Sequence, residues 1–267
     1  MNNFWLHRDQ IYAQELAVGF KVFSAGHLIW LLGIALFCYL SARFYRSRDA
    51  KGRDNMRKAC GFTIVILEYA KIIVLGLFEV RMPEFVPLHL CSAAGLAVLV
   101  YAMWPHGKGL GQVFSYAFFP AAILAVVFPS TTMYPWLNFY CLHTFVIHGL
   151  IMAFFVWLFL CCEIVPDYKG LWQGLGFMAL FSVPIYFLDG IFHVNYMFIG
   201  TRSDVGILAA LWDRIVPAYG RPAFVAVMAL IMVVVCHVFY GIYSLLGRVI
   251  LPSPPEDRKN GNNQNHA

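Results

Sequence analysis

Apolar residues occur along this chain in seven long runs that are separated by shorter, more polar connections. A helix needs about 20 mostly apolar residues to cross the hydrocarbon core of a bilayer, and the runs are close to that length. The pattern predicts an all-α, polytopic membrane protein, a bundle of seven transmembrane helices within residues 22–247. The predicted spans cover residues 22–43, 59–80, 88–104, 110–128, 138–162, 171–192 and 222–247.

Two connections are long, and they predict how the bundle lies in the membrane. Residues 44–58 are rich in Arg and Lys, and basic loops remain in the cytoplasm. With seven spans, this places the N-terminal segment 1–21 outside and the polar tail 248–267, which we expect to be disordered, in the cytoplasm. The other long connection, 193–221, mixes apolar and charged residues and is predicted to be an outer interfacial segment.

The composition agrees with this pattern, because 61% of the residues are hydrophobic and only 12% are charged. Soluble domains carry about 25% charged residues, so we expect a multi-pass protein of the cell membrane, with membrane lipids as partners and no nucleic acid. The cysteines lie in or beside apolar runs and form no CxxC pair, which disfavours a disulfide framework or a zinc site. We predict neither a metal nor another cofactor. The last span has no lysine that could hold retinal, which excludes a rhodopsin-like chromophore.

Two charged residues, Glu68 and Lys71, occur inside the second apolar run. A lone charge inside a membrane helix costs several kcal/mol, and residues three apart lie on the same helix face. One interpretation is a mutually neutralising pair that locks the helix to a neighbour. The other is a role in binding a substrate or moving a proton, which is the usual reason for a charge within the membrane.

The fifth run contains two histidines, His143 and His148. Because they are five residues apart, they project about 140° from each other and do not suit a shared metal ion. Either histidine could act as a general base, since imidazole transfers protons near neutral pH. The alternative is a histidine that simply bonds to a neighbouring carbonyl group or side chain.

The stretch VPLHLCS (86–92) places His89 and Cys91 at the start of the third run. If Pro87 opens the helix, these two side chains project about 200° apart and cannot form a hydrogen-bonded pair. Cys91 could still be activated by a histidine of another helix, such as His143. The alternative is that Cys91 is an inert packing residue, as most membrane cysteines are.

The predicted orientation gathers the unusual polar residues in the outer half of the bundle. Its candidates for a polar pocket end the second span, begin the third and fifth, lie within the fifth, or end the sixth; they are Glu79, Arg81, His89, Asn138, His143, His148, Asp189, His193, Asn195 and Tyr196. The sequence therefore predicts a pocket that opens toward the outer leaflet.

Several short strings, taken together and in order, resemble the YwaF-like integral membrane protein family, whose animal relatives form the transmembrane protein 164 group. They are FSAGHL (23–28), Glu68, VPLHLCS, FPSTTMYP (128–135), the fifth-span histidines and NYMFI (195–199). The resemblance implies a seven-helix bundle. From the animal branch it also implies a lipid acyltransferase that moves a fatty acyl chain onto ether phospholipids through a cysteine.

The resemblance transfers unevenly to the residues of this chain. The relatives' Pro-Cys-His motif falls on Pro87, Leu88 and His89, so a leucine occupies the position of the expected nucleophile. The relatives' fifth-span histidine falls on His143. Asp189 occupies a position at which bacterial members have asparagine.

We predict from these observations a lipid acyltransferase that acts on a phospholipid or a lipid-linked substrate. His143 or His148 would be the general base, with His89 or Asn138 polarising the carbonyl oxygen. Cys91 could carry the acyl group, although a direct transfer needs no carrier. The expected substrate-binding residues are Glu68, Lys71, Asn138, Asn195 and Tyr196. A transporter or channel for a small solute, and a structural membrane protein without catalysis, are the alternatives.

Overall fold

The fold is seen in a computed structural model, which describes residues 3–6, 8–16, 18–77, 86–104 and 107–250. Over these residues the chain consists of helices, turns and loops, which confirms the predicted all-α class. The elements are η1 (Asn3–Trp5), α1 (Arg8–Ala13), α2 (Ala25–Arg46), α3 (Ala50–Leu77), α4 (Leu90–Met103), α5 (Lys108–Val113), η3 (Phe114–Phe118), α6 (Phe119–Val127), α7 (Phe139–Leu160), α8 (Tyr168–Phe192) and α9 (Gly206–Ile250). The end of the second predicted span, 78–80, the pocket candidates Glu79 and Arg81, and most of the predicted tail, 251–267, lie outside the described residues.

Six helices in the described part of the chain are long and apolar enough to cross a membrane. They are α2, α3, the continuous run from α5 to α6, α7, α8 and α9. The third predicted span corresponds to α4, whose 14 residues extend only about 21 Å at 1.5 Å per residue. The protein is therefore a multi-pass helical membrane protein, in which α4 is shorter than the hydrocarbon core is thick.

The basic segment 44–58 differs from its prediction as a loop, because α3 begins at Ala50. Asp49 stabilises this start by accepting a hydrogen bond from the Gly52 N–H at 2.9 Å. One turn later, Lys58 donates to Asp54 at 2.7 Å. Pairs of opposite charge four residues apart favour a helix in a polar sequence, so the helix continues beyond the apolar run that predicted it.

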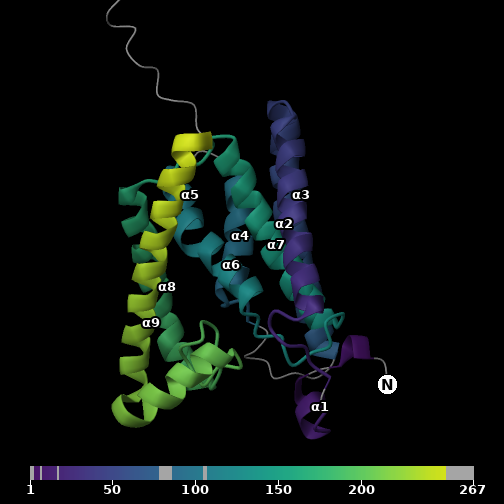
Figure 1. The fold of residues 1–267 in the computed structure, drawn as a ribbon, viewed down its shortest axis with the longest axis vertical. Helices are drawn as coiled ribbons and strands as arrows, with labels where there is room; N and C mark the ends of the chain where they lie inside the picture. The colour runs from purple at the N-terminus through teal and green to yellow at the C-terminus, as the bar shows by residue number, and fades with distance from the viewer. Residues whose placement is uncertain (1–2, 7, 17, 78–85, 105–106, 251–267) are drawn as a thin grey trace, which may run out of the picture.

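The predicted interfacial segment 193–221 consists of a loop followed by the first part of α9. The chain turns sharply at Gly220, where a φ of 79° lies in the left-handed region that favours glycine. Residues 206–219 therefore form a separate helical arm that lies across the end of the bundle, as Figure 1 shows. The part of α9 after this turn contains the predicted final span, residues 222–247.

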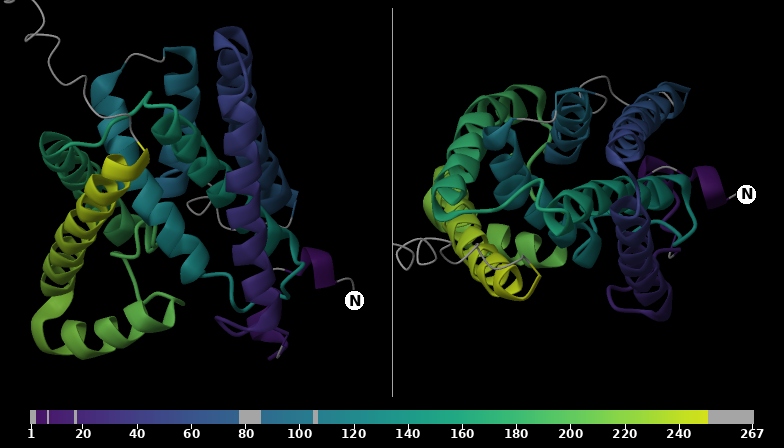
Figure 2. Two further views of the ribbon diagram at one scale, coloured as in Figure 1. Left: turned by 45° about the horizontal axis from the view of Figure 1, so that its top comes forward. Right: turned by 90° about the horizontal axis from the view of Figure 1, so that it is seen from above.

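The chain runs back and forth between two ends of the bundle (Figure 1). The basic end contains the α2–α3 turn and residues 161–167, whereas the distal end contains residues 3–6, 8–16, 18–24, 128–138 and 193–219. Figure 2 shows α7 in the middle of the bundle, with α2 and α3 on one side and α8 and α9 on the other. Most side chains of α7 between Tyr140 and Phe159 are buried. The core is thus built around the helix that carries His143 and His148.

A proline explains why the fourth span is not one regular α-helix. In a regular α-helix the N–H of residue 120 would donate to the carbonyl of Tyr116. Pro120 has no N–H group, so this hydrogen bond is missing. Here the chain forms the π-helical turn η3, and the Cys236 thiol of α9 donates to the Tyr116 carbonyl at 3.2 Å. Tyr243, also on α9, donates to the carbonyl of Ser115 at 2.7 Å. Side chains of α9 thereby satisfy carbonyl groups that would otherwise be buried without partners.

Glycines allow α3 and α4 to approach closely. A Cβ atom added to Gly61 would lie 2.9 Å from the Cα atom of Leu99, and one added to Gly95 would lie 2.6 Å from Cγ2 of Ile64. Membrane helices associate through such small residues, because lipid supplies no hydrophobic driving force between helices. This close packing brings the middle of α3 against the start of α4.

Gly61→Val should therefore destabilise the protein by about 2 kcal/mol, since its side chain meets the backbone of α4. Gly76→Val is the matched control on the same helix, because no atom lies within 4 Å of the corresponding Cβ position. The free energy of unfolding, measured for both variants by denaturation in the same detergent micelles, checks the prediction. Equal effects of the two substitutions would show that the α3–α4 contact is not tightly packed.

Candidate functional site

Three helices bring polar side chains together at one buried position. Glu68 of α3, Ser92 of α4 and His143 of α7 meet there, and the residue Glu68 is only 7% exposed. The two oxygens of its carboxylate have different surroundings. Oε2 accepts hydrogen bonds from the Lys71 ammonium at 2.7 Å and from the Ser92 hydroxyl at 3.1 Å.

The other oxygen, Oε1 of Glu68, is buried and lies 3.8 Å from Nε2 of His143. It has no hydrogen-bond partner among the described residues. An unpaired carboxylate oxygen inside a protein is costly unless a proton or a donor reaches it. This oxygen is therefore poised to interact with the imidazole of His143.

His143 is held between this carboxylate and an apolar hollow. Its Nε2 lies 3.3 Å from the carbonyl oxygen of Leu67, and both neighbouring groups at Nε2 are acceptors. The network therefore places the ring hydrogen of neutral His143 on Nε2 and the lone pair on Nδ1. The ring also lines a hollow of about 160 Å³, whose other walls are the apolar side chains of Leu67, Phe139, Leu142 and Val146. We call this the His143 hollow.

His89 is connected both to this cluster and to the distal end. It is the N-terminal cap residue of α4, and its Nδ1 lies 2.9 Å from the carbonyl oxygen of Tyr196. Its ring is also close enough to Lys71 and Glu68 to interact electrostatically with their charges. Because a carbonyl can only accept, neutral His89 carries its hydrogen on Nδ1 and presents an acceptor at Nε2. We predicted that His89 polarises a substrate carbonyl, which requires a hydrogen-bond donor. Nε2 of His89 can donate only when the ring is protonated to the imidazolium.

Asp189 fixes the loop that holds His89. Its Oδ1 accepts from the backbone N–H of Tyr196 at 3.0 Å, and the residue Asp189 is 1% exposed. Gly200 packs so closely on Asp189 that an added Cβ would lie 2.7 Å from the Asp189 Cβ. The end of α8 and the 194–200 loop therefore form one unit that positions the Tyr196 carbonyl against His89.

Three other predicted residues have structural partners. Nδ1 of His148 lies 2.7 Å from the carbonyl of Thr144, one turn earlier on α7. Asn138 caps α7 by accepting from the Tyr140 N–H at 2.9 Å and donates to the Leu6 carbonyl at 3.0 Å. Asn195 closes its loop through hydrogen bonds with Thr201 and Gly200. Asn138 was expected to polarise a substrate carbonyl, but its amide already holds two segments together.

Cys91 and Leu88 pack against different apolar clusters. Cys91 packs against the main core, and the charges of Lys71 and Glu68 reach its thiol. Leu88, at the position of the relatives' cysteine, packs instead with the small apolar cluster at the end of α8, which includes Ile185 and Tyr196. The Cys91 thiol is therefore close enough to the Glu68 cluster to be affected by its charges.

Ser92 was not among the residues predicted from the sequence. It lies in VPLHLCS directly after Cys91, and a serine in an apolar helix carries no distinguishing pattern. Only the packing of α4 on α3 shows that its hydroxyl faces the Glu68 carboxylate.

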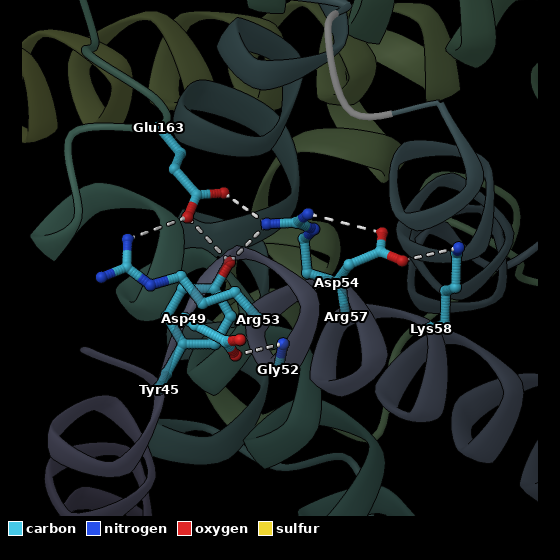
Figure 3. Close-up of polar contacts among 8 residues, drawn as sticks. All are labelled: Tyr45, Asp49, Gly52, Arg53, Asp54, Arg57, Lys58 and Glu163. Atoms are coloured by element: carbon cyan, nitrogen blue, oxygen red, sulfur yellow. Dashed lines mark hydrogen bonds and ion pairs between the residues drawn. The ribbon is translucent and has the colours of Figure 1, made fainter. Parts of the chain in front are cut away.

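A second polar network, at the basic end, was also missed (Figure 3). Glu163 accepts from Arg57 at 2.7 Å and from the Tyr45 hydroxyl at 2.9 Å, and Arg57 also donates to that hydroxyl at 2.7 Å. The network joins α2, α3 and the chain segment after α7. Its arginine belongs to the segment that the sequence assigned to a solvated loop, yet Arg57 is only 8% exposed.

The sequence was compared with models of known protein families. Residues 22–243 match the model of the TMEM164 family. The chain belongs to the TMEM164 family. The resemblance to the transmembrane protein 164 group is thereby confirmed, and the TMEM164 match includes Glu68, His89, Cys91, Ser92 and His143. Searches of curated proteins and of solved structures gave no match.

Proposed function

We propose that this TMEM164 family member is a membrane-embedded acyltransferase that moves a fatty acyl chain between lipids. One observation carries the proposal: His143 lines an apolar hollow, and the Glu68 carboxylate lies 3.8 Å behind its Nε2. Such a histidine can act as a base on a substrate whose chain lies in apolar surroundings. Membership of the TMEM164 family supports the proposal, because the resemblance to the animal branch implies a lipid acyltransferase.

In the proposed reaction, Nδ1 of His143 accepts the proton of a hydroxyl group on the acceptor lipid. The hydroxyl oxygen attacks the ester carbonyl carbon of the donor lipid, and the bond from that carbon to the donor's alcohol oxygen breaks. The proton then passes to the departing alcohol, so one ester is exchanged for another without oxidation or reduction. Glu68 stabilises the imidazolium formed in between, as a buried carboxylate does in a Ser-His-Asp triad.

The residues around this pair have supporting roles in the proposal. Lys71 and Ser92 hold the Glu68 carboxylate through its other oxygen, which leaves Oε1 for His143. Tyr196 fixes the ring of His89. Cys91 offers a covalent variant, in which its thiolate takes the acyl group from the donor and passes it to the acceptor. A loss of activity in Cys91→Ser would favour that variant, whereas full activity would favour direct transfer.

The proposal includes the orientation of the bundle in the cell membrane. We assign seven crossings, with α4 as the third, the N-terminal segment outside and residues 248–267 in the cytoplasm. The arginines and lysines of residues 44–58 support this orientation, because the positive-inside rule places them in the cytoplasm. His143 lies within the first two turns of α7 from the distal end, so the site is assigned to the outer half of the bilayer.

Comparative lipid analysis of membranes with and without the protein tests the proposed activity. The wild type should change the distribution of acyl chains among phospholipids, and His143→Ala should reduce that change at least tenfold, because the transfer loses its base. His237→Ala is the matched control, since His237 is an exposed histidine on α9 that bonds to its own helix. Unchanged lipids with the wild type, or equal losses in both variants, would contradict the proposal.

A transporter is the second candidate, and the Glu68–Lys71 ion pair is the observation that favours it. Buried ionisable groups within membrane helices often mark the path of an ion or a proton. Uptake of a labelled solute or of protons into proteoliposomes, with acyl chains unchanged, would favour transport over acyl transfer. The fully apolar neighbours of His143 in its hollow favour a lipid chain instead.

A further inference from the structure

A second hollow, of about 250 Å³, lies at the distal end, and we call it the distal hollow. Three segments that are far apart in the sequence line it: residues 22–23, before α2; residues 128–132, after α6; and residues 204–207, at the start of α9. The first two segments include Phe23 of FSAGHL and residues 128–132 of FPSTTMYP, which have no role in the proposed acyl transfer. Because these segments line one hollow together, they indicate a second function for this part of the protein.

Two phenylalanines form an aromatic wall of the distal hollow. Phe23 and Phe128 are arranged edge to face, with ring centroids 6.3 Å apart, and 54% and 38% of their surfaces are exposed. Phe23 has a φ of 61°, which is a strained backbone conformation for a phenylalanine. Strain of this kind persists only where surrounding contacts enforce it, and it is concentrated at functional sites.

His27 supplies the contacts that hold this wall. Its Nδ1 accepts the N–H of Phe23 at 2.8 Å, and its Nε2 donates to the carbonyl of Val126 at 2.8 Å. Since a backbone N–H must donate, the hydrogen of neutral His27 is fixed on Nε2. The ring is completely buried and both nitrogens are used. The histidine of FSAGHL thus ties together the two segments that present the phenylalanines.

The charged residue that lines the distal hollow is Asp204. Asp204 is exposed and accepts a hydrogen bond from the Tyr12 hydroxyl at 3.3 Å. The nearby Arg202 is directed toward another carboxylate, donating to both oxygens of Asp213 at 2.8 Å. The hydrogen bonds that Arg202 donates to the Asp213 carboxylate raise the pKa of Arg202 above its ordinary value. Asp204 therefore keeps its negative charge available beside the aromatic wall.

We propose that the distal hollow binds the ammonium headgroup of a zwitterionic phospholipid. Aromatic rings together with a carboxylate attract organic cations, and quaternary ammonium groups in particular bind in aromatic surroundings. An inorganic cation such as calcium would need six or more oxygen ligands, whereas the lining of the distal hollow is mainly apolar. The negative charge disfavours an anionic group.

The depth and the size of the distal hollow point to the same ligand. The hollow lies where α2 begins, α6 ends and the α9 arm begins, which is the level of the headgroups if these helices cross the bilayer. Its volume is below the range of about 300–1,000 Å³ that is usual for larger ligands, and it suits a headgroup better than a whole lipid. This inference goes beyond the proposed transfer, because binding requires no reaction.

Titration of the purified full chain with dioctanoyl phosphatidylcholine or dioctanoyl phosphatidylglycerol, followed by native mass spectrometry, tests this site. The two lipids have the same chains, and only the first carries an ammonium group. We expect the choline lipid to bind about five- to tenfold more tightly, a difference within the range of one cation–π and charge interaction. Asp204→Asn and Phe23→Leu should each remove most of this preference, whereas Phe23→Tyr, which retains the ring, should keep it.

Glu15→Gln is the matched control, because it removes one exposed carboxylate from the same end of the molecule. Equal binding of the two lipids to the wild type would overturn the proposal, as would an equal loss of preference in Glu15→Gln and Asp204→Asn. Thermal unfolding of each variant separates a loss of binding from a loss of folding. Since binding is measured without an acyl acceptor, its failure is distinguishable from a failure of acyl transfer.

Discussion

Glu68→Leu should destabilise the protein by about 3–5 kcal/mol, because it leaves the ammonium group of Lys71 without its carboxylate. The Lys71 and Glu68 side chains are only 21% and 9% exposed, and their charged atoms are 2.7 Å apart. Removal of one member of such a pair leaves an uncompensated charge in apolar surroundings. The free energy of unfolding, measured by denaturation in detergent micelles, gives the size of the effect.

The double variant Glu68→Leu/Lys71→Leu separates folding from chemistry. Replacement of both members of a buried ion pair by apolar residues is often neutral or stabilising, so the double variant should recover most of the stability lost by Glu68→Leu. Acyl transfer should remain lost, because His143 no longer has a carboxylate beside Nε2. Recovery of both stability and activity would show that the pair only locks α3 to its neighbours.

An exposed ion pair serves as the control for this experiment. Arg202 and Asp213 form hydrogen bonds of 2.8 Å, but more than half of each side chain is exposed. Exposed pairs contribute little to stability, so Asp213→Leu should leave the unfolding transition almost unchanged. A large effect at Asp213 would mean that charge itself, rather than burial, determines the stability of the protein.

The sequence predicted most of the fold because the length of an apolar run determines whether a helix can cross a membrane. It predicted the start of α3 less well, since residues 50–58 are polar and hydropathy assigns polar residues to loops. The helix begins at Ala50 because Asp49 caps it and because Asp54 pairs with Lys58. Such short-range pairs extend a helix without any apolar signal.

Within the candidate site, the sequence could predict only contacts between residues of the same helix, because helical spacing alone determines them. The three-residue spacing predicted that Glu68 and Lys71 share a face, and their side chains form an ion pair. The contact of Ser92 with Glu68 depends on how α4 packs on α3, and the position of His143 depends on how α7 lies in the bundle. These contacts join residues 24 and 75 positions apart, so no local pattern contains them.

The polar network at the basic end predicts a second large loss of stability, on substitution of Glu163. Glu163→Ala should destabilise the protein by about 2–3 kcal/mol. This is less than the effect of removing one member of a fully buried ion pair, because 24% of the Glu163 side chain is exposed. The substitution removes an acceptor that Arg57 and Tyr45 share, and these two residues are 8% and 0% exposed. Arg57 keeps the Tyr45 hydroxyl at 2.7 Å and the Asp54 carboxylate at 3.5 Å. Nε of Arg57 already has no partner among the described residues, so the guanidinium would be left poorly compensated.

The unfolding free energy of Glu163→Ala, together with hydrogen exchange of α2 and α3, tests this role. Glu163→Gln should cost less, because its amide oxygen can still accept from Arg57. Asp54→Asn is the comparison variant: Asp54 is more exposed and contacts Arg57 only at 3.5 Å, so its substitution should cost less than Glu163→Ala. The folded fraction of Glu163→Ala should retain acyl transfer, because the network is at the basic end and the Glu68–His143 pair lies in the distal half. If activity were lost while hydrogen exchange stayed unchanged, Glu163 would belong to the reaction rather than to the attachment of the α2–α3 hairpin to α7.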